Sequence, residues 1–571
     1  MLRKLRVGTL ALILGAIVPL SSVADTSAGA YLAGRHAAVN SDYREAARYY
    51  TNALARDPKN VELLESTVLA NLALGEVEKA QTLAQMLEAQ KQSSQIARIV
   101  ITSELAASGE FEALMARPPD TSGIGPWVDG LVKAWAQLGT GDTEGAMAAF
   151  DRLGAEAGMR GFVMYHKALA FAAIGEFAQA EAIFGDAGAG AAGQTRRGVM
   201  AHAQVLANLD RHEEALTVLR TSFGENTDPE LEAMIAALEA GGDVPLSVAP
   251  NVTAGIAEVF FTFAVVLRSE DAGDYYVLLY ARIARHLRPD HVDALLLTAG
   301  LLENLGQYRL AIEEYKAIPA DDPAFHVAEM GRADALRRSG KSDQSVEVLE
   351  QLARTHGALA VVHSKLGDVL RSQDDYAGAI AAYDRALERT PEEADARWIL
   401  FYTRGIAHER SDMDAEMERD FRAALAINPE QPQVLNYLGY SMVEQRRNLE
   451  EALDMIERAV AASPNSGYIV DSLGWVLYRL GRYDEAVGHM ERAVELLPVD
   501  PVINDHLGDV YWAVGRAREA EFQWRRALSF IDEGGSDSEA DPDRIRRKLN
   551  VGLDSVLEEE GAPPLVAADE I

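Results

Sequence analysis

Small and apolar residues recur along this chain with a spacing of 34 or 35 residues. The recurring elements are a Leu-Gly pair and a later alanine: Leu438-Gly439 with Ala452, Leu473-Gly474 with Ala486, and Leu507-Gly508 with Ala520. A period of this length is typical of helix hairpins that stack on copies of themselves, because one hairpin cannot bury its apolar side alone. The pattern therefore predicts an all-α repeat array.

The clearest repeat starts at Gly467 and shows why each position has its residue type. Gly474 and Ala486, at positions 8 and 20, let the two helices of the hairpin approach closely. Pro498, at position 32, cannot continue a helix and ends the hairpin. The same template fits repeats that start at residues 27, 61, 127, 161, 196, 258, 292, 326, 360, 398 and 501. The chain is thus predicted to be an α-solenoid, or superhelix, of about 12 to 13 hairpins, in one array or in two halves.

These positions resemble the tetratricopeptide repeat (TPR). That resemblance implies that the first helices of successive repeats line a concave groove where peptides bind. Residues 434–528 resemble a group of proteobacterial envelope TPR proteins, which includes an outer-membrane lipoprotein adaptor of a periplasmic carboxy-terminal processing protease. The resemblance rests on three segments: Asn436-Tyr437-Leu438-Gly439-Tyr440, Asp471-Ser472-Leu473-Gly474-Trp475 and His506-Leu507-Gly508-Asp509. This chain departs from that lipoprotein because it has no cysteine to carry a lipid.

The last three repeats carry a stripe of aromatic, amide and acidic residues at positions 5, 9 and 12 of the first helix. These positions share one helix face at i, i+4 and i+7. Rings supply apolar contact, an amide holds a peptide backbone, and carboxylates attract cations. We predict a groove for basic or hydrophobic extended segments, formed by Asn436, Tyr440, Asp471, Trp475, Tyr478, Asp505, Asp509 and Trp512. The alternative is that Trp475 and Trp512 are packed between neighbouring helices.

Turn-forming residues divide the array once. Residues 241–255 are rich in glycine and proline, and they form either a linker between two halves or a long loop. The expected parts are therefore an N-terminal superhelix over 25–240 and a C-terminal superhelix over 256–532. Residues 533–571 are expected to hold an acidic linker, a capping helix over 545–557 and a tail.

The N-terminus has the pattern of a signal peptide, predicted over residues 1–24. Three cations precede the uncharged segment from Val7 to Leu20, and Ser22-Val23-Ala24 offers small residues for cleavage. A retained membrane anchor is the alternative, since the uncharged stretch just reaches spanning length. No later segment is expected to cross a membrane, so no integral span remains after cleavage. A periplasmic location without a lipid anchor follows, because the chain has no cysteine.

The formal net charge of −34 narrows the class of partner. An acidic surface repels phosphate backbones, so nucleic acid is not an expected partner. The same surface attracts basic segments, or else it serves solubility alone.

Motifs that would carry catalysis do not occur in the required context. The twelve histidines form no HExxH pair, and no serine lies in a GxSxG turn. Residues 188–193 match GxGxxG, but they follow a helix rather than a strand and are expected to form a loop between hairpins. We therefore expect no catalytic, metal or cofactor site, and a protein that is not an enzyme.

The predicted function is that of a periplasmic scaffold or adaptor that binds extended polypeptide segments for an envelope protease or assembly machine. The alternative is a structural component of a polysaccharide or pilus export apparatus. The partner, the oligomeric state, the retention of the signal peptide and hinge motion at 241–255 stay open.

Overall fold

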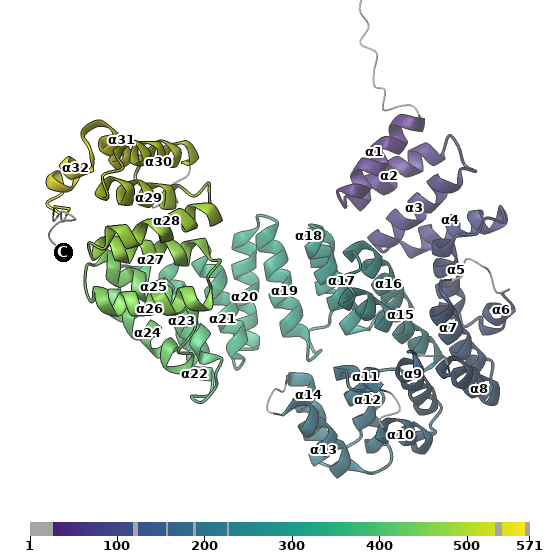
Figure 1. The fold of residues 1–571 in the computed structure, drawn as a ribbon. Coiled ribbons are helices and arrows are strands. Elements are labelled where there is room, and N and C mark those ends of the chain that lie inside the picture. Colours follow the sequence, from purple (N-terminus) through teal and green to yellow (C-terminus); the bar gives the residue numbers. More distant parts are fainter. Residues whose placement is uncertain are drawn as a thin grey trace, which may run out of the picture. The chain divides into compact units, whose positions relative to one another are not determined.

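The computed structural model describes residues 27–117, 124–155, 158–186, 190–224, 228–531, 540–562 and 564–565. The predicted signal peptide lies outside these residues. The described residues form 32 α-helices and no strand, which confirms the predicted all-α repeat solenoid (Figure 1). The chain divides into two compact units, residues 1–348 and 349–571.

The first unit holds the helices α1 (Ser27–Val39), α2 (Tyr43–Leu54), α3 (Val61–Leu74), α4 (Val77–Ala89), α5 (Gln95–Ala107), α6 (Phe111–Ala116), α7 (Pro126–Gly139), α8 (Thr143–Gly154), α9 (Arg160–Ala173), α10 (Phe177–Gly185), α11 (Gly190–Gly193), α12 (Arg196–Ala207), α13 (His212–Phe223), α14 (Pro229–Glu239), α15 (Val252–Ser269), α16 (Asp274–Leu287), α17 (Val292–Asn304), α18 (Tyr308–Lys316) and α19 (Phe325–Arg338). The boundary between the units falls within α20 (Ser342–Thr355). The short helix α11 stands where a loop was expected.

The second unit holds the helices α21 (Ala360–Arg371), α22 (Tyr376–Arg389), α23 (Arg397–Glu409), α24 (Asp414–Ile427), α25 (Pro432–Glu444), α26 (Leu449–Ala462), α27 (Gly467–Arg479), α28 (Tyr483–Leu496), α29 (Pro501–Ala513), α30 (Ala517–Phe530), α31 (Pro542–Val551) and α32 (Leu553–Glu559).

Helix starts follow the predicted repeat register. Seven predicted repeats begin at the first residue of a helix, at Ser27, Val61, Arg196, Val292, Ala360, Gly467 and Pro501. The glycine at position 8 is required by close packing: a Cβ on Gly474 would stand 2.2 Å from Sδ of Met490, and one on Gly508 would stand 2.4 Å from the Trp524 ring. The large side chain at position 24 therefore fills the space that the glycine leaves.

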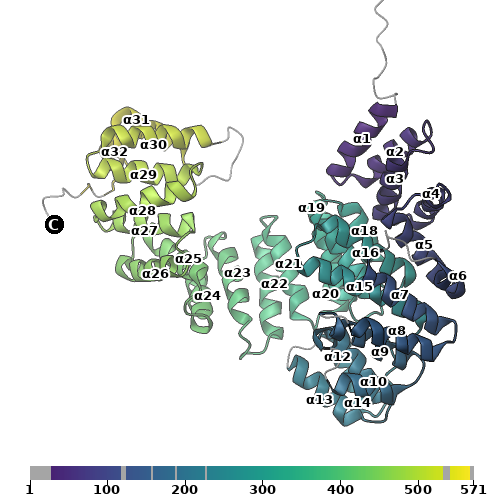
Figure 2. The same ribbon diagram turned by 45° about the vertical axis from the view of Figure 1, so that its right-hand side comes forward.

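In the first unit, the helix pair α15–α16 covers the face formed by the first helices of the early repeats. We call the face made by the first helix of each repeat the inner face. Both α15 and α16 pack against α5, and in addition α15 contacts α7 and α9 while α16 contacts α3 (Figures 1 and 2). Gly255 makes the approach possible, since a Cβ there would stand 2.4 Å from the Trp135 ring. The part of the inner face made by α3, α5, α7 and α9 is thus covered by the chain itself.

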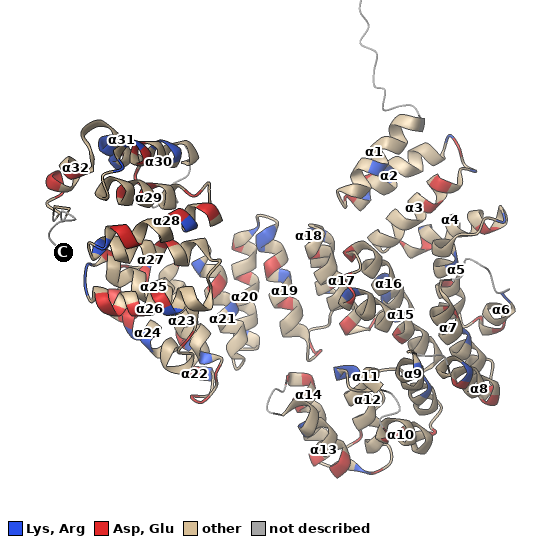
Figure 3. Cartoon of the chain, viewed as in Figure 1, with Lys and Arg blue, Asp and Glu red and all other residues tan. Residues whose placement is uncertain are grey.

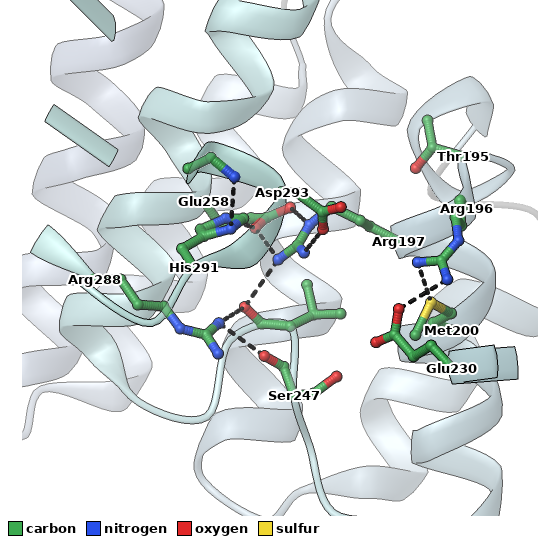
Figure 4. A network of polar contacts seen from close by, with 12 residues as sticks. Thr195, Arg196, Arg197, Met200, Glu230, Ser247, Glu258, Arg288, His291 and Asp293 are labelled. Carbon is green, nitrogen blue, oxygen red and sulfur yellow. Dashed lines mark hydrogen bonds and ion pairs between the residues drawn. The ribbon is translucent and has the colours of Figure 1, made fainter. Parts of the chain in front are cut away.

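A buried ion network fixes α15 in place (Figure 4). Glu258 is 1% exposed; it accepts a hydrogen bond of 2.9 Å from the Tyr165 hydroxyl and one of 2.6 Å from Nη2 of Arg197. Arg197 also pairs with Asp293, and His291 Nε2 lies 3.6 Å from the Glu258 carboxylate. Burial alone would raise the pKa of Glu258, but Arg197 and His291 outweigh it and hold the pKa well below its usual range. Four helices, α9, α12, α15 and α17, are joined through one carboxylate.

The segment before α15 is tied down inside the first unit. Nη1 of Arg288 donates to the carbonyl oxygens of Ser247 and Val248 at 2.7 and 2.9 Å (Figure 4). Gln204 Nε2 donates to Ser247 Oγ at 2.7 Å. Residues 252–255, predicted to be part of the linker, are the first turn of α15. The predicted linker at 241–255 therefore lies within one unit, and the division between the units falls elsewhere, within α20.

Helix α15 is also long and apolar enough to cross a membrane, with 18 residues and a mean hydropathy of 1.6. This corrects the expectation that no segment after the signal peptide is long and apolar enough to cross a membrane. Half of the helix is buried in the first unit. A helix in a protein core passes the same two measures, so they do not by themselves indicate a membrane span.

The C-terminal segment holds two helices where the sequence pattern predicted one. Gly552 separates α31 from α32 with a φ of 84°, a conformation that favours glycine. Ile545 and Leu553 are fully buried against the last repeat. The segment closes the apolar end of the array, as expected of a cap.

Acidic residues are distributed over helices of both units rather than gathered at one place (Figure 3). Many of them are neutralised locally by an arginine or lysine three or four positions away, such as Glu485 by Arg482 and Glu214 by Arg211. The net charge therefore does not by itself mark a binding site.

Candidate protein-binding groove

The inner face of the second unit contains a hollow of about 680 Å³ at the N-terminal ends of α25, α27 and α29. Three of the eight predicted groove residues line it: Asn436, Tyr440 and Asp471. The remaining lining residues that matter here were not predicted: Tyr437, Tyr468, Ile469, Ile503, Phe530 and Ile531. Eight of the 17 lining residues are therefore aromatic or branched aliphatic.

The hollow has one polar atom without a hydrogen-bond partner among the described residues and one exposed aromatic side chain at its rim. Oδ1 of Asn436 is buried and has no hydrogen-bond partner there. A buried acceptor without a partner costs about 1–3 kcal/mol, so a donor from a bound molecule would be favoured at this place. Tyr468 is 61% exposed at the rim. Exposed tyrosine beside a hollow is a frequent anchor in protein interfaces.

Acidic groups at the rim set the charge of the hollow. Asp500 caps α29 by accepting hydrogen bonds from the backbone N–H groups of Val502 and Ile503, at 2.9 and 3.0 Å. Asp471 and Glu409 also line the hollow, and Arg410 is the one basic residue among the lining residues. The excess of carboxylates favours a cationic group in whatever binds there.

Asp471 is paired with a buried histidine. Its carboxylate lies 3.1 Å from Nδ1 of His506. Burial would lower the pKa of His506, but the carboxylates of Asp471, Asp505 and Asp509 outweigh it and raise the pKa. The three carboxylates thus favour the protonated, positively charged form of His506.

Two predicted groove residues form a packed stack. The Trp475 ring is stacked on Tyr478 at 4.8 Å and on His506 at 3.9 Å between centroids, and its Nε1 donates to Glu444 at 2.8 Å. Trp475 is 5% exposed and Tyr478 is 6% exposed. Both rings are therefore buried. For Trp475 this agrees with the alternative that the ring is packed between neighbouring helices.

The last three predicted residues contact the C-terminal segment. Asp505 and Asp509 bind Nζ of Lys548 from α31, with all four N–O distances between 2.6 and 2.9 Å. Trp512 Nε1 donates to Asp554 of α32 at 2.8 Å. The structure therefore divides the predicted stripe into a hollow on α25–α27, a packed centre and an end covered by the tail.

Sequence reasoning missed the first turn of each helix. Tyr468 stands at position 2 of its repeat, three residues before Asp471, so the two share a helix face. Extending the predicted stripe by one turn towards the N-terminus would have included it. Phe530 and Ile531 come from the end of α30, and no periodic signal places them in the hollow.

Sequence comparison agrees with this architecture. Models of the tetratricopeptide repeat match residues 31–94, 330–394, 444–501 and 197–221. These segments match the tetratricopeptide repeat, and the described residues of the chain form an all-α repeat solenoid. Repeats of this class generally mediate protein–protein interaction and form scaffolds without catalytic groups.

Known proteins resemble parts of the chain. A TPR repeat-containing protein of Pseudomonas aeruginosa is 29% identical over 174 residues, which are 30% of this chain and 28% of that protein. The human protein O-mannosyl-transferase TMTC1 is 22% identical over 190 residues, which are 33% of this chain and 21% of that protein. The chain thus spans under a third of either relative. The structure of the APC/C hetero-tetramer Cut9–Hcn1 is similar over 92% of this chain and 96% of that one, with 13% identity and a TM-score of 0.38.

Proposed function

We propose that this protein is a periplasmic scaffold or adaptor that binds extended polypeptide segments in the hollow on α25, α27 and α29. The observation that carries the proposal is the open inner face of the second unit, where an unpaired buried amide oxygen lies beside aromatic rings. An extended segment offers backbone N–H groups at regular intervals, and one of them would satisfy Asn436.

The chemistry of the hollow selects the kind of segment. Tyr437, Tyr468 and Phe530 offer apolar contact to a large side chain. Asp471, Asp500 and Glu409 favour a neighbouring lysine or arginine. We therefore propose as partner a protein segment in which an aromatic or branched aliphatic residue stands next to a basic one.

The location and the cellular role rest on sequence patterns. The signal-like N-terminus supports export across the inner membrane, with a mature chain that begins at Asp25. The resemblance of residues 434–528 to an envelope protease adaptor supports delivery of substrates to such a protease or to an assembly machine. Cell fractionation and mass spectrometry of the mature N-terminus would test this; a chain that stays in the cytoplasm would contradict it.

A peptide array probed with the purified chain tests the binding mode. Peptides that combine aromatic and basic residues should bind, whereas acidic peptides should not. Tyr468→Ala should weaken binding at least about fivefold, a loss of roughly 1 kcal/mol. Phe522→Ala is the matched control, because Phe522 is an aromatic residue of α30 that is 59% exposed and does not line the hollow. Equal effects of the two substitutions would contradict the proposal.

The alternative role is structural, within a polysaccharide or pilus export apparatus. A deletion strain separates the two roles. Altered turnover of envelope proteins would favour the adaptor, whereas lost export with normal turnover would favour the structural component. We also propose that the protein is not an enzyme, since the match to the human transferase covers 21% of that protein.

A further inference from the structure

The end of the second inner face holds a complete site for a lysine side chain. Nζ of Lys548 contacts both oxygens of Asp505 and both oxygens of Asp509, and the Lys548 side chain is 0% exposed. The Trp524 ring lies beside the ammonium group, with its centroid 5.8 Å from Nζ. Two carboxylates and an aromatic face are the groups that bind a primary ammonium.

The site requires a cation to be stable. Asp509 is 1% exposed and Asp505 is 8% exposed, and the two carboxylates share one ammonium group. Two buried carboxylates without a counter-charge would repel each other, and burial would favour their protonation. Burial raises the pKa of Asp505 even with Lys548 bound. The face thus selects a positively charged occupant.

The occupant seen here shows what chemistry fits around the lysine. Ile545, one helical turn before Lys548, is fully buried against the last repeat. Arg544 lies 3.6 Å from Asp509 as a second cation, whereas Arg546 is 60% exposed and pairs with Asp543 within α31. The site therefore fits an amphipathic helix with a branched aliphatic residue three positions before a lysine.

We propose that Asp505, Asp509 and Trp524 form a lysine site for a basic amphipathic helix of a protein partner, and that α31 holds this site as the chain's own competitor. The inference rests on the proposed function, because it makes the covered end of the same groove available to a partner. It adds a helical, lysine-dependent binding mode to the extended mode in the hollow. Release of α31 would uncover both carboxylates and Trp512.

The test uses the full chain with Lys548→Glu, which places a third carboxylate beside two others and expels the tail. The probe is a labelled synthetic peptide with the sequence of residues 541–562. We expect this peptide to bind the Lys548→Glu chain at least about tenfold more tightly than it binds the unchanged chain, whose own tail fills the site. A peptide with Lys548→Gln should bind at least about tenfold more weakly than the unchanged peptide, which is about 1.4 kcal/mol. A peptide with Arg546→Gln is the matched control and should bind like the unchanged one.

Equal binding of the Lys548→Gln and unchanged peptides would overturn the proposal, as would no binding to a Lys548→Glu chain that keeps its helical content. If that chain does not fold, hydrogen–deuterium exchange of the unchanged chain gives a second measurement.

Excess unchanged peptide should displace the chain's own tail and so speed exchange in residues 542–559, whereas the Lys548→Gln peptide should not. No difference between the two peptides would overturn the proposal. Dimerisation of the unchanged chain that Lys548→Gln abolishes would also overturn it, since a second copy would then be the occupant. If the lysine site is overturned, peptide binding in the hollow can still be tested separately with Tyr468→Ala.

Discussion

The inner faces of the two units are built from the same repeat and differ in what covers them. In the first unit the helix pair α15–α16 packs on α3, α5, α7 and α9. In the second unit the corresponding face keeps a hollow at α25–α27–α29 and is covered only at its end by α31. A repeat face thus becomes core or binding surface according to whether the chain supplies its own occupant.

The side chains of the two faces reflect this difference. The filled face has Gly255 against Trp135 and a buried carboxylate with every partner in place. The open face has an exposed tyrosine and an amide oxygen without a partner. Close packing around a fully bonded carboxylate indicates a structural contact, whereas an exposed aromatic side chain beside a hollow indicates a surface available to another molecule.

The largest expected effect comes from removing the buried carboxylate. Glu258→Ala leaves Arg197 buried with only Asp293 as a charged partner, and it should lower the free energy of unfolding of the first unit by about 3–5 kcal/mol. Urea unfolding of the purified chain measures the loss. Tyr165→Phe removes one hydrogen bond of the same network and should cost about 1 kcal/mol. A loss below 1 kcal/mol for Glu258→Ala would show that the network does not hold α15.

Two buried histidines, one in each unit, should respond to pH in opposite directions. Burial lowers the pKa of His166 in the first unit from 6.5 to about 4. Its neutral form is required for folding, so the stability is present above pH 6.5 and is lost as the pH falls, by about 1.4 kcal/mol per unit down to pH 4. The raised pKa of His506 has the opposite effect on stability. The stabilisation that protonated His506 contributes is fully present below pH 6.5 and is lost as the pH rises through the folded-state pKa.

Hydrogen–deuterium exchange in mild denaturant, corrected for intrinsic rates, reports the two units separately at pH 5.5 and pH 8. His166→Gln should reduce the acid sensitivity of the first unit, in which His291 also has a lowered pKa. His506→Gln should reduce the alkaline sensitivity of the second unit. Identical pH profiles in the variants and the unchanged chain would contradict the assignment of these two groups.

Packing density gives a smaller difference. Gly255→Ala would force a methyl group into the Trp135 ring and should destabilise the first unit by about 1–3 kcal/mol. Gly300→Ala in α17 is the matched control, because no atom lies within 4 Å of the added Cβ. It should stabilise the helix by up to about 1 kcal/mol. Thermal unfolding compares the two; destabilisation by both would show that the close approach of α15 to α7 is not the cause.

The smallest effect on stability is expected at the open hollow. Tyr468→Ala should change the free energy of unfolding by less than about 0.5 kcal/mol, because the side chain is 61% exposed. Its effect should be confined to peptide binding. Urea unfolding of Tyr468→Ala beside Phe522→Ala checks this; a large loss of stability would place Tyr468 in the core and remove the contrast between the faces.

Local patterns in the sequence were enough for the repeat architecture but not for the groove. Gly474, Ala486 and Pro498 act on the helices directly beside them, so their spacing predicts helix starts well. The groove prediction placed Asn436 and Asp471 in the hollow, yet Trp475 is stacked beneath the surface. Helical spacing indicates a shared face, but it does not reveal which rings on that face a neighbouring helix covers.

The sequence by itself determined the class of fold and the register of the repeats, and it predicted a preference for cations along the last inner face. These properties depend on neighbours within one or two repeats, where a periodic pattern is informative. Only the tertiary structure decided which parts of the inner faces stay open. That outcome depends on contacts such as Glu258 with Tyr165, 93 residues apart, and Lys548 with Asp505, 43 residues apart. The repeating pattern of the sequence does not predict such contacts, because each depends on where the whole array brings two distant helices together.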